Sequence, residues 1–243
     1  MRLFGLIGYP LTHSFSKRYF SEKFENEGIK DCRYELFPIP SIGELNSILD
    51  KHPDLAGINV TIPYKEQVLS FLNEKDDVVQ KIKACNCIRI NEGKLKGYNT
   101  DVTGFERSLK EKLQPNHHKA LVLGTGGASK AVEFVLQRLG ITFRNVSRKP
   151  SVHSYSYEQL TPAVIADHTL IVNTTPLGTF PAVNEAPPLP YEALTSRHYL
   201  FDLVYNPART LFLQKGEERG AAIKNGYDML VIQAEESWRI WNL

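Results

Sequence analysis

Several polar side chains in the first hundred residues stand where the sequence pattern places the ends of strands. Ser14 and Ser16 follow the first apolar run, and Asn59, Thr61 and Lys65 surround the end of a later one. The other members of this group are Asn86, Asn99, Thr100 and Asp101. Open α/β sheets bind ligands beyond the carboxyl ends of their strands. The hydroxyls, amides, ammonium and carboxylate of the group suit a small polyhydroxylated acid.

Each of these residues also has a purely structural explanation. Ser16 fits a helix N-cap, Asn99 and Asp101 fit a turn, and Lys65 fits a solvated lysine at the start of a helix. The functional interpretation therefore depends on the group as a whole.

A glycine-rich turn carries the second chemical signal. Gly124-Thr125-Gly126-Gly127 follows an apolar strand, and Ala128 opens a helix. Such a turn lets a pyrophosphate approach the backbone and the free N–H groups at the helix start. The usual third glycine would fall at Ser129, whereas the small packing residue here is Ala131. The alternative is a plain glycine turn between a strand and a helix, and a P-loop is excluded because no Gly-Lys-Ser/Thr follows.

The elements that must position these residues alternate between strands and helices. In the first block we expect strands at residues 3–7, 34–39 and 55–62, helices at 16–27, 42–50 and 65–72, and a hairpin of 85–90 with 94–98. In the second block we expect strands at 120–123, 141–146, 170–172 and 200–204, helices at 102–113, 128–139 and 229–243, and a loop at 181–190. This alternation predicts an α/β fold with a largely parallel sheet.

Composition and charge narrow the class of protein. The chain has 243 residues, of which 42% are hydrophobic, and a net charge of +2. This apolar content excludes a disordered chain, and the balanced charge argues against nucleic-acid binding. No apolar run reaches the ~18 residues of a membrane span. The apolar segment 3–11 is broken by Gly5, Gly8 and Pro10, so we expect a buried strand rather than a secretion signal.

The cysteines point to a reducing compartment. Cys32, Cys85 and Cys87 are too few for a disulfide framework, and no further ligands stand at metal-binding spacing. We therefore expect a cytoplasmic protein without a metal, and we assign no role to the histidines.

A set of longer segments forms a more specific pattern. It consists of Ser14-Phe15-Ser16, Asn59-Val60-Thr61-Ile62-Pro63-Tyr64-Lys65, Gly97-Tyr98-Asn99-Thr100-Asp101, the glycine turn, Asn173-Thr174-Thr175-Pro176-Leu177-Gly178, Asp202-Leu203-Val204-Tyr205-Asn206-Pro207 and Gly226-Tyr227-Asp228-Met229-Leu230-Val231-Ile232-Gln233-Ala234. In this order, over nearly the whole chain, the segments resemble the shikimate dehydrogenase family. Two positions depart from the family pattern: Cys87 stands where Thr or Ser is usual, and Ser147-Arg148-Lys149 replaces Asn-Arg-Thr.

The resemblance implies the reversible reduction of 3-dehydroshikimate to shikimate by NADPH, a step of aromatic amino-acid biosynthesis. It implies that Lys65 and Asp101 handle the proton that the substrate oxygen gains, and it leaves open which of the two holds that proton. The implied substrate contacts are Ser14, Ser16, Thr61, Asn86, Tyr205 and Gln233. The implied cofactor contacts are Gly124, Gly126, Gly127, Ala128, Ser147, Arg148, Lys149, Gly226 and Met229.

The resemblance also implies two domains with the active site between them. Residues 1–101 with the returning C-terminal helix, 226–243, would form an α/β substrate-binding domain. Residues 102–225 would form a Rossmann-like domain that binds NADP.

Charge after the glycine turn favours NADP over NAD. An NAD enzyme places Asp or Glu ~20 residues past the turn, but no acidic residue occurs between Glu133 and Glu158. Ser147, Arg148 and Lys149 stand there instead, and Arg can hold a 2′-phosphate with paired hydrogen bonds. The alternative is that these are solvated loop cations.

We expect a small-molecule substrate, no nucleic-acid or membrane partner, and a monomer or homodimer. Two alternative functions stay open: a quinate/shikimate dehydrogenase that uses NAD, and a catalytically inactive nucleotide-binding sensor of the same fold.

Overall fold

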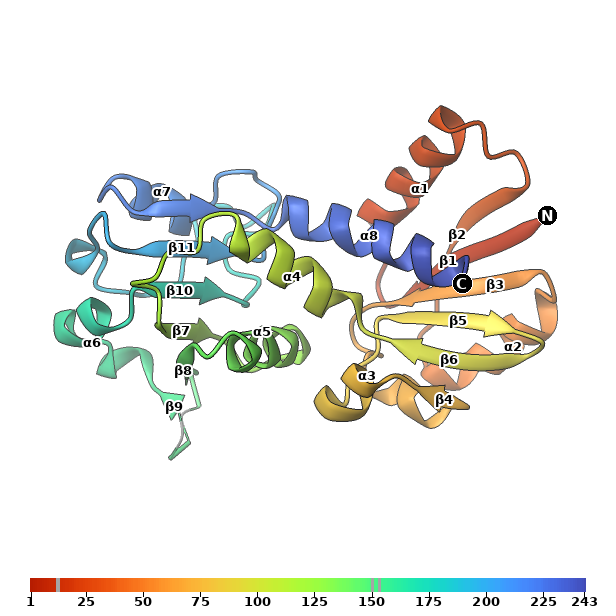
Figure 1. Ribbon diagram of the computed structural model, residues 1–243, viewed down its shortest axis with the longest axis horizontal. Coiled ribbons are helices and arrows are strands. Elements are labelled where there is room, and N and C mark those ends of the chain that lie inside the picture. The colour runs from red at the N-terminus through yellow and green to blue at the C-terminus, as the bar shows by residue number, and fades with distance from the viewer. Residues whose placement is uncertain (12–13, 150, 153) are drawn as a thin grey trace. The chain divides into compact units, whose positions relative to one another are not determined.

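The chain folds into two compact units. The computed structural model describes residues 1–11, 14–149, 151–152 and 154–243, so His13 and His153 lie outside its described part. The first unit is Met1–Thr103 with Leu230–Leu243, and the second is Gly104–Met229. Each contains a six-stranded sheet with helices (Figure 1), which confirms the α/β fold class. The ligands predicted for the two domains, residues 1–101 with 226–243 and residues 102–225, stay predictions.

The first unit is built on a mixed sheet. Its strands are β1 Arg2–Gly8, β2 Cys32–Pro38, β3 Leu55–Val60, β4 Glu74–Lys75, β5 Cys87–Asn91 and β6 Lys94–Tyr98. They lie in the order β2-β1-β3-β5-β6-β4. β1 is parallel to β2 and β3, whereas β5 is antiparallel to β3 and β6. β4 is parallel to β6, so three of the five strand pairings are parallel, as expected, and the two antiparallel ones involve β5 of the expected hairpin, whose turn at Glu92 and Gly93 has φ of 50° and 72°.

The helices of the first unit differ in part from expectation. They are α1 Phe15–Asn26, α2 Leu45–Lys51, α3 Asp77–Ile82 and most of α8 Tyr227–Trp241, with 3₁₀ turns η1 Ile42–Glu44 and η2 Gln67–Ser70. The helix expected at 65–72 is reduced to η2, and the Lys65 carbonyl accepts from Cys85 N at 2.8 Å. The N-cap of α1 is Ser14, whose side chain accepts from Lys17 N, and not Ser16.

Two hydrophobic clusters cover opposite faces of the first sheet. Leu3 and Ile7 of β1 join one cluster, and Phe4 and Leu6 join the other, as strand alternation requires. The second cluster contains Phe20 of α1 and Trp241 of α8, which explains why the C-terminal helix returns to this unit.

The second unit has a wholly parallel sheet in the order β12-β11-β10-β7-β8-β9. Its strands are β7 Lys119–Leu123, β8 Thr142–Val146, β9 Ser154–Tyr155, β10 Leu170–Asn173, β11 Tyr199–Asp202 and β12 Ala222–Lys224. Its helices are most of α4 Thr100–Lys110, α5 Gly127–Arg138, α6 Pro162–Asp167 and α7 Leu211–Glu217, with 3₁₀ turns η3 Tyr157–Gln159 and η4 Tyr191–Ala193. Within the described residues, no helix has the length and apolarity to cross a membrane.

Candidate active site

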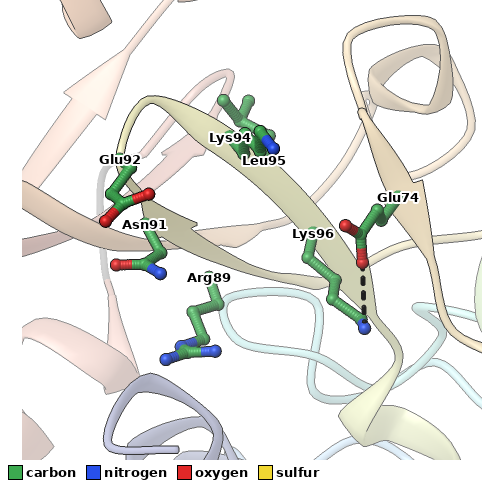
Figure 2. Close-up of a pocket in the computed structure, with 7 residues that line it drawn as sticks. All are labelled: Glu74, Arg89, Asn91, Glu92, Lys94, Leu95 and Lys96. Atoms are coloured by element: carbon green, nitrogen blue, oxygen red, sulfur yellow. Dashed lines mark ion pairs between the residues drawn. The ribbon is translucent and has the colours of Figure 1, made fainter.

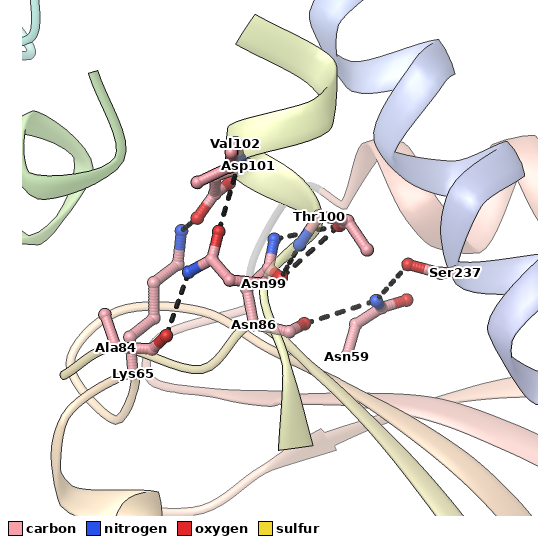
Figure 3. A network of polar contacts seen from close by, with 9 residues as sticks. All are labelled: Asn59, Lys65, Ala84, Asn86, Asn99, Thr100, Asp101, Val102 and Ser237. Carbon is pink, nitrogen blue, oxygen red and sulfur yellow. Dashed lines mark hydrogen bonds and ion pairs between the residues drawn. The ribbon is translucent and has the colours of Figure 1, made fainter. Parts of the chain in front are cut away.

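A lysine–aspartate ion pair lies at the centre of the candidate site in the first unit. Lys65 Nζ is 2.8 Å from Asp101 Oδ2, and the two side chains are 17% and 7% exposed. Lys65 follows β3, and Asp101 lies in the first turn of α4 (Figure 3). An ammonium held by a carboxylate, and still partly open to solvent, can deliver a proton to a neighbouring oxygen.

The sheet register brings the two residues together. Asn59 of β3 pairs with Cys87 of β5, and Cys87 pairs with Tyr98 of β6. The carboxyl ends of β3 and β6 therefore meet at the start of β5. Residues that follow those two strands, Lys65 and Asp101 among them, gather at one edge of the sheet, as expected from the sequence.

Asn86 is tied to the start of α4. Its Oδ1 accepts from Thr100 N at 2.7 Å, and its Nδ2 donates to Thr100 Oγ1 at 3.1 Å. Asn86 is 5% exposed. The structure thus places this predicted substrate contact beside the Lys65–Asp101 pair, with much of its amide engaged inside the protein.

A chain of hydrogen bonds links two other predicted substrate contacts. Ser16 bonds the Tyr34 hydroxyl, and that hydroxyl donates to Asn59 Oδ1 at 2.9 Å. Asn59 Nδ2 donates to Ser237 Oγ at 2.9 Å, and Ser237 Oγ donates to the Gln233 carbonyl at 2.9 Å. Ser16 on α1 and Gln233 on α8 are therefore fixed to the same sheet. Sequence reasoning missed Tyr34 and Ser237, because only the folded structure brings β2, β3 and α8 together.

Ser14 and Thr61 lie near the carboxyl end of β1. Ser14 caps α1, which follows β1. Thr61 is half-buried, and its N–H donates to the carbonyl of Ile7 at 3.0 Å. A Cβ on Gly8 would lie 2.4 Å from Thr61 Cγ2, so glycine is needed for this approach.

The glycine turn of the second unit has the geometry of a phosphate cradle. Gly124 has a φ of +106°, which favours glycine, and its N–H donates to Val146 O at 2.8 Å. Gly126 is the N-cap of α5. A Cβ built on Gly126 or Gly127 would have no atom within 4 Å, so the backbone faces open space where α5 begins. Ala128 lies in the first turn of α5, where N–H groups have no intrahelical acceptor.

Ser147, Arg148 and Lys149 lie directly after β8, as predicted. Ser147 N donates to Tyr155 O at 2.9 Å, and Lys149 N donates to Ser147 Oγ at 3.1 Å. Arg148 and Lys149 are exposed. Two cations thus stand on a loop whose N–H groups bond to Tyr155 of β9 and to the Ser147 side chain.

A buried aspartate orders the loop that carries Tyr205. Asp202 is fully buried and accepts from Asn173 Nδ2 at 2.9 Å, Val204 N at 3.0 Å and Thr210 Oγ1 at 2.5 Å. Burial raises the pKa of this carboxyl to about 6. Tyr205 itself is half-buried in the second unit.

Gly226 and Met229 lie where the second unit ends. A Cβ on Gly226 would lie 2.1 Å from Leu203 O, so no other residue fits there. Met229 is 5% exposed in α8.

A surface pocket of the first unit lies apart from these residues. It is lined by Glu74, Arg89, Asn91, Glu92, Lys94, Leu95 and Lys96 (Figure 2). Lys96 and Glu74 form an ion pair at 3.0 Å. The pocket shares no residue with the Lys65–Asp101 site. Among the described residues, no cluster of three or more His, Cys, Asp or Glu could hold a metal ion.

The parallel sheet of the second unit, with a glycine turn at the start of α5, defines the Rossmann-like class of dinucleotide-binding proteins. The first unit adds a lysine–aspartate ion pair on a mixed sheet. The class is therefore that of two-unit α/β proteins with one Rossmann-like unit.

Comparisons with known proteins specify the family. A family model for the shikimate dehydrogenase substrate binding domain matches residues 6–88. Proteins named shikimate dehydrogenase (NADP(+)) from Halothermothrix orenii and Ignicoccus hospitalis are 34% and 35% identical, over 98% of this chain and 89% and 92% of theirs. The shikimate 5-dehydrogenase of Thermus thermophilus, solved with NADP(H) and shikimate, is 31% identical, with a TM-score of 0.87 over 99% of this chain and 93% of its own. The chain belongs to the shikimate dehydrogenase family.

Proposed function

We propose that this protein catalyses the reversible reduction of 3-dehydroshikimate to shikimate by NADPH, in aromatic amino-acid biosynthesis. Relatives that match nearly the whole chain bear the name of this activity. The observation that carries the proposal to this chain is the Lys65–Asp101 ion pair, with its 2.8 Å separation at the ligand-binding edge of the first sheet. A sensor that had lost its chemistry would not need this pair.

Lys65 and Asp101 handle the proton in this proposal. NADPH, when bound, supplies the hydride that the substrate carbonyl carbon accepts. The carbonyl oxygen becomes a hydroxyl by taking a proton from the acid–base pair, with Lys65 Nζ as the donor. Asp101 orients that ammonium, and solvent restores the proton afterwards. Shikimate and NADP⁺ are then released, so atoms and charge balance.

The remaining polar residues of the site hold the substrate. Ser14 and Ser16 bind its carboxylate, while Thr61, Asn86, Tyr205 and Gln233 contact its hydroxyls or carboxylate. The hydrogen bonds that fix Ser16 and Gln233 to the first sheet support these roles, because a rigid site lowers the entropy lost on binding.

The residues of the second unit fit NADP. The open backbone at Gly126 and Gly127 leaves room for a pyrophosphate, with Gly124 and Ala128 completing the turn. Ser147, Arg148 and Lys149 suit the 2′-phosphate, because they bring exposed positive charge where an NAD enzyme carries a carboxylate. Gly226 and Met229 line the nicotinamide.

Absorbance at 340 nm tests the function directly. The wild type should oxidise NADPH with 3-dehydroshikimate and reduce NADP⁺ with shikimate, and each reaction is repeated with NAD(H) and with quinate. Lys65→Ala should lower kcat by ~10²–10⁴-fold, the usual loss for a general acid. Lys96→Ala is the matched control, because Lys96 also pairs with a carboxylate of the first unit but is 42% exposed. No turnover by the wild type would overturn the proposal, and equal efficiency with NAD would favour the quinate/shikimate alternative.

The chain acts in this proposal as a monomer or homodimer in the cytoplasm. Both members of the catalytic pair come from one chain, so the pair needs no second copy. The three cysteines are free and buried, which fits a reducing compartment. Light scattering after size-exclusion chromatography would settle the oligomeric state.

A further inference from the structure

Asn99 joins the start of α4 to a neighbouring segment of the first unit. Its Oδ1 accepts from Val102 N at 3.3 Å, which caps the helix, and its Nδ2 donates to Ala84 O at 3.0 Å. Asn99 is 6% exposed. Both functional groups of this amide are therefore used inside the protein (Figure 3).

The segment to which Asn99 donates a hydrogen bond, residues 84–86, also bonds to the main chain of Lys65. Cys85 N, next to Ala84, donates to Lys65 O at 2.8 Å. On the other side, Asn86 accepts from Thr100 N at 2.7 Å. The three residues 84–86 thus bond to the backbone of Lys65 on one side and to the first turn of α4, which carries Asp101, on the other.

We propose that Asn99 is a positioning residue, which fixes Asp101 against Lys65 by bonding the first turn of α4 to Ala84. This inference rests on the proposed function, because it assumes that the Lys65–Asp101 pair performs the proton transfer. Asn99 lies two residues before Asp101 and holds it through the backbone, without touching the substrate.

The type of residue supports this role over simple capping. Ser, Asp, Thr and Asn all cap helices well through a side-chain oxygen. Of these four, only Asn adds an N–H donor of the right reach for the Ala84 carbonyl. A helix that needed only a cap would not need the amide.

The expected effect follows from the distance that Asn99 controls. Lys65 Nζ and Asp101 Oδ2 are 2.8 Å apart. A shift of about 1 Å would break their hydrogen bond, and misplacements of this size cost about 10²-fold in rate. We therefore expect a loss of about ten- to hundred-fold in kcat when the bond to Ala84 is removed.

Asn99→Ser is the sharpest test, because serine keeps the cap and removes only the bond to Ala84. The matched control is Asp76→Ala, which deletes the cap of α3 in the same unit, where Asp76 Oδ1 accepts from Val79 N at 2.7 Å. Asn99→Ser should lower kcat about ten- to hundred-fold, with KM for NADPH within about twofold. Asp76→Ala should keep the wild-type kcat, although it is less stable.

Kinetics corrected for the folded fraction separate positioning from a general loss of structure. In Asn99→Ser, kcat per folded molecule should fall while KM for NADPH stays within about twofold, because only the alignment of Asp101 against Lys65 is lost. A variant that is merely unfolded in part would regain the wild-type kcat once its activity is divided by the folded fraction measured by circular dichroism. Should Asn99→Ser not fold, Asn99→Thr provides the same test, since threonine also offers a capping oxygen and lacks the amide donor, without adding a charge.

The possible outcomes are distinguishable. A wild type without turnover would overturn the proposed function. An active wild type, with the kcat of folded Asn99→Ser or Asn99→Thr within about threefold of its own, would overturn the role of Asn99 alone.

Discussion

Substitutions in the Lys65–Asp101 ion pair should affect stability and activity differently. Removing both charges should restore part of the stability that one substitution costs, but it should not restore activity. Lys65→Met removes the ammonium but keeps the length of the side chain, which leaves the Asp101 carboxylate, 7% exposed, without its partner. Breaking a buried ion pair costs about 3–5 kcal/mol, because the remaining charge is poorly solvated. Lys65 is 17% exposed, so water reaches the pair slightly and we expect about 3 kcal/mol of destabilisation.

Removing the second charge should restore part of that stability. Asp101→Asn alone should cost only about 1–2 kcal/mol, since the lysine stem can turn its ammonium toward water. The double variant, Lys65→Met with Asp101→Asn, leaves no buried charge, so we expect it to be about 1 kcal/mol more stable than Lys65→Met. It should be inactive, because no group remains to carry the proton.

Urea unfolding followed by tryptophan fluorescence is a suitable assay. Both tryptophans of the chain, Trp238 and Trp241, lie in α8 within the first unit, so the signal reports the unit that contains the pair. Activity is measured on the same samples at 340 nm. The loss of unfolding free energy in the double variant is compared with the sum of the losses in the two single variants. If the two values agreed to within about 0.5 kcal/mol, the pair would not be coupled and the reasoning would be refuted.

Three further predictions concern the cofactor, a buried acid and a buried thiol. Arg148→Ala should raise KM for NADP more than KM for NAD in steady-state kinetics, by a factor that corresponds to about 1.5–3 kcal/mol. Equal effects on both cofactors would contradict the 2′-phosphate contact proposed for Arg148. Because burial raises the pKa of Asp202 from 3.8 to about 6, its contribution to stability is present below about pH 4 and is lost as the pH rises through 6. Asp202→Asn should therefore remove about 3 kcal/mol of this pH dependence in urea unfolding followed by circular dichroism, and an unchanged slope would argue against the shift. Cys87→Thr should leave kcat/KM for shikimate nearly unchanged, whereas a tenfold change would show that the position touches the substrate.

The long elements of the fold could be predicted because their apolar residues repeat with a clear period. β7, β8 and α5 lie within a residue or two of the expected positions, as do β1 and α1. The missed elements, such as β9, β12 and α6, are two to six residues long, too short to establish a period. Their existence depends on pairing with a neighbour that lies far away in the sequence.

The residues of the candidate site could be predicted from the sequence, but the hydrogen bonds that connect them could not. Motif resemblance pointed to Lys65, Asp101 and Asn86, and the structure brings these three together. Roles for Asn99 and Tyr34 could not be derived, because both depend on which carbonyl or amide lies opposite in the folded sheet. A polar residue in a turn has the same local signature whether it caps a helix or also holds a catalytic segment.

Gly57 shows how a residue far from the chemistry helps to complete the site. A Cβ on Gly57 would lie 2.3 Å from Trp241 Nε1, and that indole donates to Ile88 O at 3.0 Å. The glycine in β3 therefore makes room for the end of α8 to lie against the sheet. Because α8 is held there, Ser237 reaches Asn59, and Gln233 lies one helical turn before Ser237. In sequence this glycine only weakens a strand pattern, but in the fold it lets a segment from the far end of the chain contribute to the site.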